Sequence, residues 1–140
     1  MAMKTIIVSG YFDPIHVGHL EMLSLARALG DELVVIVNGD VQAKIKKGRS
    51  FMREEDRLEI VKSIKYVDLA FISVDENATV CKSLKRVRKM YPHNELVFAN
   101  GGDRKGHEVP EAQACEKLDI EMVDGLGDKI RSSSKYTGLK

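Results

Sequence analysis

The chain has 140 residues and a formal net charge of +1, with 44% hydrophobic and 31% charged residues. This composition is typical of one globular domain, and we place no domain boundary between residues 1 and 140. A net charge near zero argues against bulk binding of nucleic acid or of a membrane surface, which generally requires a basic excess. No apolar run reaches the length of a membrane span and the sequence begins without a secretory pattern, so we expect a cytoplasmic protein.

Apolar runs rich in β-branched residues alternate along the chain with segments whose apolar residues recur every three or four positions. The runs predict buried strands, and the recurring pattern predicts helices. In chain order we expect a strand at 4–10, a helix at 17–29, a strand at 32–38, a loop at 39–53, a helix at 54–64, a strand at 67–74, a helix at 78–90, a strand at 95–100, a short helix at 110–117 and a strand at 120–123. This alternation predicts an α/β fold: a Rossmann-like, doubly wound, five-stranded parallel sheet with helices on both faces.

The two cysteines and two basic runs can each be assigned to one of these predicted helices or loops. Cys81 and Cys115 lie in predicted helices without metal-ligand spacing, so we expect reduced thiols in the core. The basic run at 82–89 is expected on an exposed helix face. The basic residues at 44–53, with no acid among them, indicate a solvated loop when taken alone, and a mobile cationic lid if a phosphate site lies beside them.

Glycine-containing polar segments follow four of the predicted strands. They are YFDPIHVGH after the first strand, NGDVQAKIKKGR after the second, NGGDRKGH after the fourth and DGLGDKIRSSS after the fifth. The carboxyl ends of parallel strands meet at one edge of a sheet, where open sheets bind their ligands. Four such segments with His, Lys, Asp and Ser at their centres predict a functional site at this edge.

His16 and His19 are the most informative residues of the first segment. Their spacing places both rings on one side of the first turn of the following helix, and Gly18 between them leaves room for a ligand at the backbone. The free amides and the dipole of a helix N-terminus suit a phosphate group. Zinc is the rival interpretation, but it needs further ligands, and no HExxH or Cys/His set is present.

The segments after the fourth and fifth strands offer two further candidates. Ser132 and Ser133 follow a glycine-rich turn and either cap the last helix or form a second phosphate cradle. Asp103, at the end of the fourth strand, is placed to hold a ribose, to hold an amine on a base edge or only to shape a local turn.

These residues resemble a known family. GYFDPIHVGH is similar to the HxGH motif of the nucleotidyltransferase superfamily, and nearly the whole chain resembles its small cytidylyltransferase-like group. RLEIVKSIKYVD at 57–68 looks like a segment of glycerol-3-phosphate cytidylyltransferases. AKIKKG and GGDR resemble segments of the heptose-phosphate adenylyltransferases of lipopolysaccharide core biosynthesis. RSSS looks like the serine stretch that opens the last helix in this group.

The resemblance implies an enzyme that moves an AMP or CMP group from ATP or CTP to a phosphorylated small molecule and releases pyrophosphate. The acceptor phosphate would attack the α-phosphorus in line, so positioning and charge stabilisation would carry the catalysis. Mg²⁺ would accompany the nucleotide. Dimerisation is common in this group, so a homodimer is among the expectations although no residue pattern points to one.

The resemblance also implies roles for individual residues. Catalytic contacts would come from His16 and His19 and from Lys47 with Lys44, the lysines closing over the α-phosphate and the acceptor. The other expected contacts are nucleotide binding by Gly10, Tyr11, Phe12, Asp13, Gly18, Asp103, Ser132, Ser133 and Ser134, and acceptor or phosphate binding by Asn38, Asp40, Arg57 and Arg104. No protein side chain is assigned to a metal ion.

The identity of the acceptor is left open by the sequence. Gly127 and Lys65 stand where glycerol-phosphate enzymes have arginines, which favours a sugar phosphate or a related acceptor over glycerol phosphate. FAD synthetase and phosphopantetheine adenylyltransferase activities are the alternatives, but with 6% aromatic residues and no Trp the sequence shows no evident stacking platform for a flavin ring. An alternative of another class is a non-catalytic nucleotide-binding module, which a missing histidine or lysine would have favoured.

Overall fold

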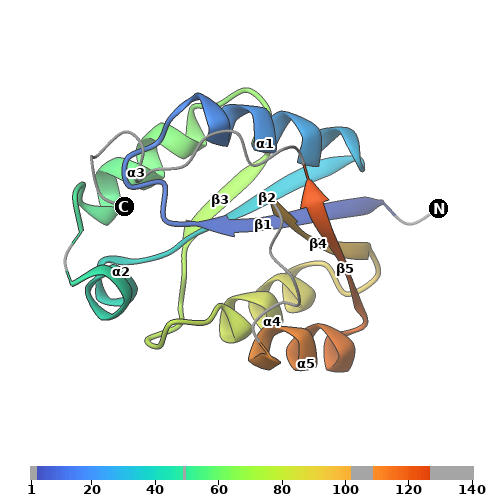
Figure 1. The fold of residues 1–140 in the computed structure, drawn as a ribbon. Helices are drawn as coiled ribbons and strands as arrows, with labels where there is room; N and C mark the ends of the chain where they lie inside the picture. Colours follow the sequence, from blue (N-terminus) through green and yellow to red (C-terminus); the bar gives the residue numbers. More distant parts are fainter. Residues whose placement is uncertain (1–2, 49, 102–108, 127–140) are drawn as a thin grey trace.

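Strands and helices alternate throughout residues 3–48, 50–101 and 109–126, the parts of the chain that the computed structural model describes. The elements are β1 (Lys4–Gly10), α1 (Val17–Ala28), β2 (Glu32–Val37), α2 (Asp40–Lys47), α3 (Glu54–Lys62), β3 (Leu69–Ile72), α4 (Cys81–Met90), β4 (Glu95–Gly101), α5 (Val109–Leu118) and β5 (Ile120–Leu126), as Figure 1 shows. The predicted alternation is therefore confirmed.

The strands form one sheet with the order β3-β2-β1-β4-β5, and every neighbouring pair is parallel. This is the expected Rossmann-like arrangement. The chain moves outward in one direction from β1 to β2 and β3, and in the other direction from β4 to β5. The strand order therefore reverses between β1 and β4, and their carboxyl ends flank the crevice where such sheets bind ligands.

Helices cover both faces of the sheet, with α1 and α3 on one side and α4 and α5 on the other (Figure 1). Neighbouring side chains of β1 point to opposite faces, so Ile6 and Val8 pack with Leu23 of α1, whereas Ile7 packs with Leu84 of α4. Burial on both faces explains why the strands are almost continuous apolar runs.

The segment 39–53 was expected to be a loop, and this is wrong because it contains the eight-residue helix α2. Gly39 precedes the helix, and Gly48 ends it with a positive φ of 85°, a conformation that glycine adopts without strain. Gln42 and Ala43 form its buried side. A helix this short and this polar leaves too few apolar residues for a periodic pattern to be recognised.

Other boundaries shift by a few residues. The helix expected from residue 78 begins at Cys81, because Asn77 Oδ1 accepts bonds from the backbone N–H and the hydroxyl of Thr79 in a local turn. The third strand is shorter than 67–74, because the Asp68 carboxylate bonds to the backbone N–H of Leu33 just before the strand begins.

The two cysteines are free thiols: Cys115 is buried, and Cys81 is half-buried at the start of α4. Burial raises the pKa of Cys115 to about 12. On α4 the expected basic face is confirmed for Lys82, Lys85 and Lys89, which are exposed. Among the described residues, no helix has both the length and the apolar character needed to cross a membrane.

Candidate functional site

The turn between β1 and α1 brings the first predicted site residues to the carboxyl edge of the sheet. Gly10 ends β1, and Phe12 follows with a φ of 53° and a buried side chain. A Cβ atom at position 10 would lie 3.1 Å from the ring of Phe12, so glycine allows this close approach. The Phe12 ring packs against the ring of His19, with centroids 4.9 Å apart. The Phe12 side chain thus supports the site from beneath.

The two histidines cap α1 reciprocally. Nδ1 of His16 accepts a hydrogen bond from the backbone N–H of Gly18 at 3.1 Å, and Nδ1 of His19 accepts one from the N–H of His16 at 3.0 Å. A nitrogen that accepts such a bond carries no proton, so this network assigns the proton of each neutral ring to Nε2. The centroids of the two rings lie 4.0 Å apart. The i, i+3 spacing therefore brings the two imidazoles side by side at the start of α1, with an angle of 32° between the ring planes.

The start of α1 and the two imidazoles together favour an anion. The backbone N–H groups of His16, Gly18 and His19 are already bonded within this turn, so the attraction comes from the helix dipole and from the Nε2–H donors. The Nε2 atom of His16 lies beneath neighbouring atoms, so contact with a ligand there requires a local shift. Among the described residues, no group of three or more His, Cys, Asp or Glu is arranged to hold a metal ion.

Asp13 connects the β1–α1 turn to the segment between α2 and α3. Its carboxylate, which is buried, accepts hydrogen bonds from the backbone N–H groups of Phe51 at 2.7 Å and Met52 at 2.6 Å. The expected role of Asp13 was to line the nucleotide pocket. In the structure its charge is used to hold residues 51–52 in place.

Arg57 is the most connected side chain at this edge. Its guanidinium, which is 0% exposed, donates to the backbone oxygens of Tyr11, Asn38 and Met52 and to the carboxylate of Asp40, at 2.6–3.0 Å. The expected role was a phosphate contact. A buried guanidinium bonded to four protein oxygens instead fixes the ends of β1 and β2 and the starts of α2 and α3 relative to one another.

Asp40 and Glu54 link the first turns of α2 and α3. The Asp40 N–H donates to the Glu54 carboxylate at 2.7 Å, and the Glu54 N–H donates to the Asp40 carboxylate at 3.2 Å. Burial alone raises the pKa of Asp40, but the bonds from Arg57 and from the Glu54 N–H, with the positive charge of Arg57, outweigh it, so the pKa lies below its ordinary value of 3.8. Asp40 is therefore held as an anion between two helices.

Gln42 is a site-supporting residue that sequence reasoning missed. It is fully buried, and its oxygen accepts bonds from the Gly39 N–H and from the side chain of Asn38. Its amide nitrogen donates to the carbonyls of Asn77 and Thr79. It joins the end of β2 to the connection after β3. The only available signal was its position beside Ala43 in a helix that the sequence did not reveal.

The remaining predicted residues are distributed as follows. Gly18 lies in the first turn of α1, Tyr11 follows β1 and reaches Gln42 O through its hydroxyl at 3.5 Å, and Lys44 is exposed on α2. Lys47 is the last residue of α2. The predicted site residues Asp103, Arg104, Ser132, Ser133 and Ser134 lie outside the described residues.

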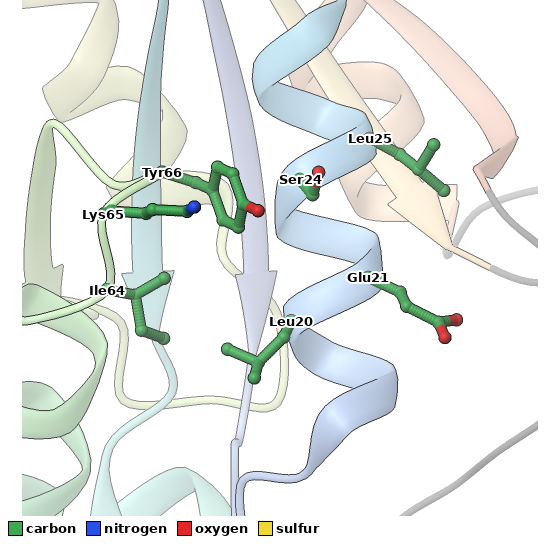
Figure 2. A pocket seen from close by; sticks show the side chains of 7 residues that line it. All are labelled: Leu20, Glu21, Ser24, Leu25, Ile64, Lys65 and Tyr66. Atoms are coloured by element: carbon green, nitrogen blue, oxygen red, sulfur yellow. The ribbon is translucent and has the colours of Figure 1, made fainter.

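A groove of about 700 Å³ lies elsewhere, between α1 and residues 64–66, and Figure 2 shows its lining side chains. It is lined by Leu20, Glu21, Ser24, Leu25, Ile64, Lys65 and Tyr66, and none of these is a predicted site residue. Nζ of Lys65 lies 5.2 Å from the centroid of the Tyr66 ring. Lys65, one of the two residues that led us to favour a sugar phosphate over glycerol phosphate, thus lies in this groove and not among the site residues described above.

Comparison with known proteins is decisive for the family. A family model described as cytidylyltransferase-like matches residues 7–105, which run from the middle of β1 past the end of β4 and include the site residues described at the carboxyl edge. The chain belongs to this family. The assignment confirms the resemblance to nucleotidyltransferases that the HxGH motif indicated.

Several members of this family are similar to the chain. It is 46% identical over 118 residues to the FAD synthase of Thermococcus kodakarensis, covering 84% of this chain and 70% of that protein. It is 32% identical over 128 residues to the bifunctional protein HldE of Aliarcobacter butzleri, covering 89% of this chain. The chain spans only 25% of that HldE protein, and 63% of the FAD synthase of Pyrococcus abyssi.

One solved structure is similar over most of its length. The lipopolysaccharide core biosynthesis protein of Thermoplasma volcanium superimposes with a TM-score of 0.68 at 26% sequence identity. The match covers 88% of this chain and 96% of that one. The fold of this chain is therefore shared with that structure over most of both chains.

Proposed function

We propose that the chain transfers AMP from ATP to the phosphate of FMN, forming FAD and pyrophosphate. The observation that carries this choice is the 46% identity to an FAD synthase over 118 residues, against 32% over 128 residues for an HldE protein. The sugar or polyol phosphate favoured by the sequence departures becomes the second candidate. The adenine base follows from the FAD product.

The geometry of the carboxyl edge supports nucleotidyl transfer. An oxygen of the acceptor phosphate forms a bond to the α-phosphorus, the bond from that phosphorus to the bridging oxygen breaks, and pyrophosphate leaves with the electron pair. Negative charge that develops on the phosphate oxygens meets the positive end of the α1 dipole, the Nε2–H donor of His19 and, after a local shift, that of His16. Arg57, Asp13 and Gln42 hold these donors and α2 in fixed positions and are positioning residues.

The described residues fit a phosphate better than a metal ion. Both Nδ1 atoms of the histidines accept backbone bonds, and the Asp13 carboxylate is engaged by two amides. Mg²⁺ would therefore arrive bound to the triphosphate, where it neutralises part of the charge.

The test is a pyrophosphate-release screen with Mg²⁺. ATP and CTP are each combined with FMN, glycerol 3-phosphate, a heptose phosphate and phosphopantetheine. We expect release only with ATP and FMN, together with FAD detected by chromatography. Release with a sugar phosphate but not with FMN would overturn the proposal. Tight ATP binding without turnover on any acceptor would identify a non-catalytic module.

A sugar phosphate is the second candidate because one observation favours it. The structural match with the lipopolysaccharide core biosynthesis protein of Thermoplasma volcanium covers 88% of this chain and 96% of that protein's chain. The heptose phosphate in the same screen decides between the two acceptors.

A further inference from the structure

The side of α2 that faces away from the sheet combines apolar and basic side chains. Val41, Lys44 and Ile45 follow one another at helical spacing on this side, which we call the outer face of α2. Val41 is 60% exposed and Ile45 is 58% exposed. The opposite side of the helix, with Gln42 and Ala43, is buried. The exposed aliphatic side chains are thus not needed for packing α2 onto the domain.

Phe51, close by in the chain, is also an exposed apolar residue. Its side chain is 68% exposed, although its backbone N–H is fixed by the Asp13 carboxylate at 2.7 Å. The preceding Ser50 donates a hydrogen bond to Asp40, the first residue of α2. Phe51 is therefore held near the helix turn that carries Val41, on a backbone that is firmly attached.

The first turn of α2 and Phe51 adjoin the predicted nucleotide site. The Tyr11 hydroxyl, from the β1–α1 turn, lies 3.5 Å from the Gln42 carbonyl of α2, and Arg57 bonds to Tyr11 O and to Asp40. The segment before the histidines and the first turn of α2 are therefore parts of one fixed assembly. A ligand whose phosphate lies at the start of α1 extends over this edge of the sheet.

We propose that the outer face of α2, together with Phe51, binds the flat, apolar ring system of the acceptor. This inference rests on the proposed function and specifies which part of the site selects the acceptor. An apolar ring gains from covering Val41, Ile45 and Phe51, which otherwise remain in water. Lys44 between them complements the phosphate or the ring oxygens of the same molecule. A glycerol or sugar phosphate has the anion but no apolar surface to offer.

The experiment compares Ile45→Gln, Phe51→Ser and the combined variant with the unaltered protein. Leu25→Gln is the matched control, because Leu25 is an exposed leucine, 43% accessible, on α1 within the separate groove. Flavin binding is followed by quenching of FMN fluorescence, and the KM values for FMN and for ATP are measured separately. Melting temperatures check that each variant folds.

We expect the Kd and the KM for FMN to rise about tenfold for each outer substitution, because each removes most of one apolar contact. The KM for ATP and the properties of Leu25→Gln remain unchanged. Riboflavin, which has the ring but no phosphate, competes with FMN, and glycerol 3-phosphate does not.

Each contrary outcome overturns a different statement. If the unaltered protein makes FAD and the variants keep its KM for FMN, the ring-binding surface is wrong and the function stands. If FMN binds and the variants weaken it but no FAD forms, the surface stands and the function is wrong. If FMN does not bind, both are wrong. If the combined variant instead converts a dimer to a monomer in sedimentation with unchanged FMN binding, the surface contacts a second copy.

Discussion

Arg57 and Arg88 lie at opposite edges of the sheet, and each guanidinium donates to several oxygens. At the carboxyl edge Arg57 bonds to three backbone carbonyls and to the Asp40 carboxylate, and it is completely buried. At the amino edge Arg88 bonds to the backbone carbonyls of Tyr91, Asn94, Leu118 and Asp119, and it is half-buried.

The difference lies in what the two arginines connect. Arg88 closes the connections from α4 to β4 and from α5 to β5, where water can replace part of its bonding. Arg57 joins four segments at the carboxyl edge, and its side chain is 0% exposed, so solvent does not reach it to replace these bonds. A guanidinium bonded to several oxygens thus stabilises turns at the amino edge and fixes the candidate site at the carboxyl edge.

Replacing the two arginines tests this comparison directly and has the largest expected effect. Arg57→Met removes a fully buried guanidinium and leaves three carbonyls and the partly exposed Asp40 carboxylate without their donor, so we expect a loss of about 3–5 kcal/mol in the free energy of unfolding. Arg88→Met, in a partly hydrated position, is expected to cost about 1–2 kcal/mol. Urea unfolding monitored by circular dichroism measures both.

Measurements of enzymatic rate distinguish the roles of Arg57 and Arg88 further. Arg57→Lys keeps the charge but cannot span the four oxygens, so we expect it to recover little of the stability or the rate. We expect Arg88→Met to keep the kcat of pyrophosphate release at temperatures where it is folded. Equal losses of stability in the two methionine variants would contradict the distinction between the edges.

The histidines provide the next contrast. His16→Ala and His19→Ala remove donors from the carboxyl edge, so we expect kcat to fall about 100- to 1,000-fold in pyrophosphate release. His93→Ala, at the amino edge beside Arg88, is the matched control and should leave the rate unchanged.

His16→Asn separates helix capping from catalysis. It retains an acceptor for the Gly18 N–H, so we expect the stability of the protein to be kept while the rate of pyrophosphate release still falls. A near-normal rate in a folded His19→Ala protein would rule out the assigned mechanism.

Most of the fold could be predicted because buried strands leave a direct record in the sequence. The runs at β1, β2 and β4 are apolar on both faces, and their alternation with helices determines a parallel sheet. The helix α2 left no such record, because its buried side consists of Gln42 and Ala43 while Val41 and Ile45 point away from the core. Its pattern therefore resembled a polar loop.

The histidine pair could also be predicted, since its spacing and the preceding strand are local features. The bonding partners of the supporting residues could not. Arg57 bonds to Tyr11, 46 positions away, and Gln42 bonds to Thr79, 37 positions away. Asp13 was expected at the nucleotide, but its partners Phe51 and Met52 lie 38 and 39 positions along the chain. The packing of the sheet decides which polar side chains meet across such separations. A single sequence does not contain that information.

Replacing Asp13 has a smaller expected effect and tests whether residues 51–52, which it holds, contribute to acceptor binding. An asparagine accepts a hydrogen bond at only one oxygen and faces the other N–H with its own donor, so Asp13→Asn should cost about 1–3 kcal/mol of stability. Because it loosens the backbone of Phe51 and Met52, we also expect the KM for the acceptor to rise. Both effects are measured with one preparation by unfolding and steady-state kinetics.

Asp75 supplies the control for Asp13. It is likewise a buried carboxylate, and it accepts backbone bonds from Lys82 and Ser83 at the start of α4. Asp75→Asn should lower stability by a similar amount with no change in the KM for the acceptor. An equal rise of that KM in both variants would show that the effect follows general loosening of the domain rather than the attachment of residues 51–52.

The smallest expected effect is the pH dependence of the bond between Asp40 and Arg57. The pKa of Asp40 is lower in the folded protein than its ordinary value of 3.8, because the bonds and charge around it outweigh its burial. Its stabilisation is therefore fully present above pH 3.8 and is lost as the pH falls through the lower, folded pKa. Since the Asp40 side chain is partly exposed, we expect Asp40→Asn to cost only about 1 kcal/mol at pH 6. Urea unfolding from pH 6 to pH 3 measures the difference in the free energy of unfolding between the unaltered protein and the variant. We expect this difference to shrink only below pH 4. A difference that stays constant over this range would mean that Arg57 does not hold Asp40 as an anion.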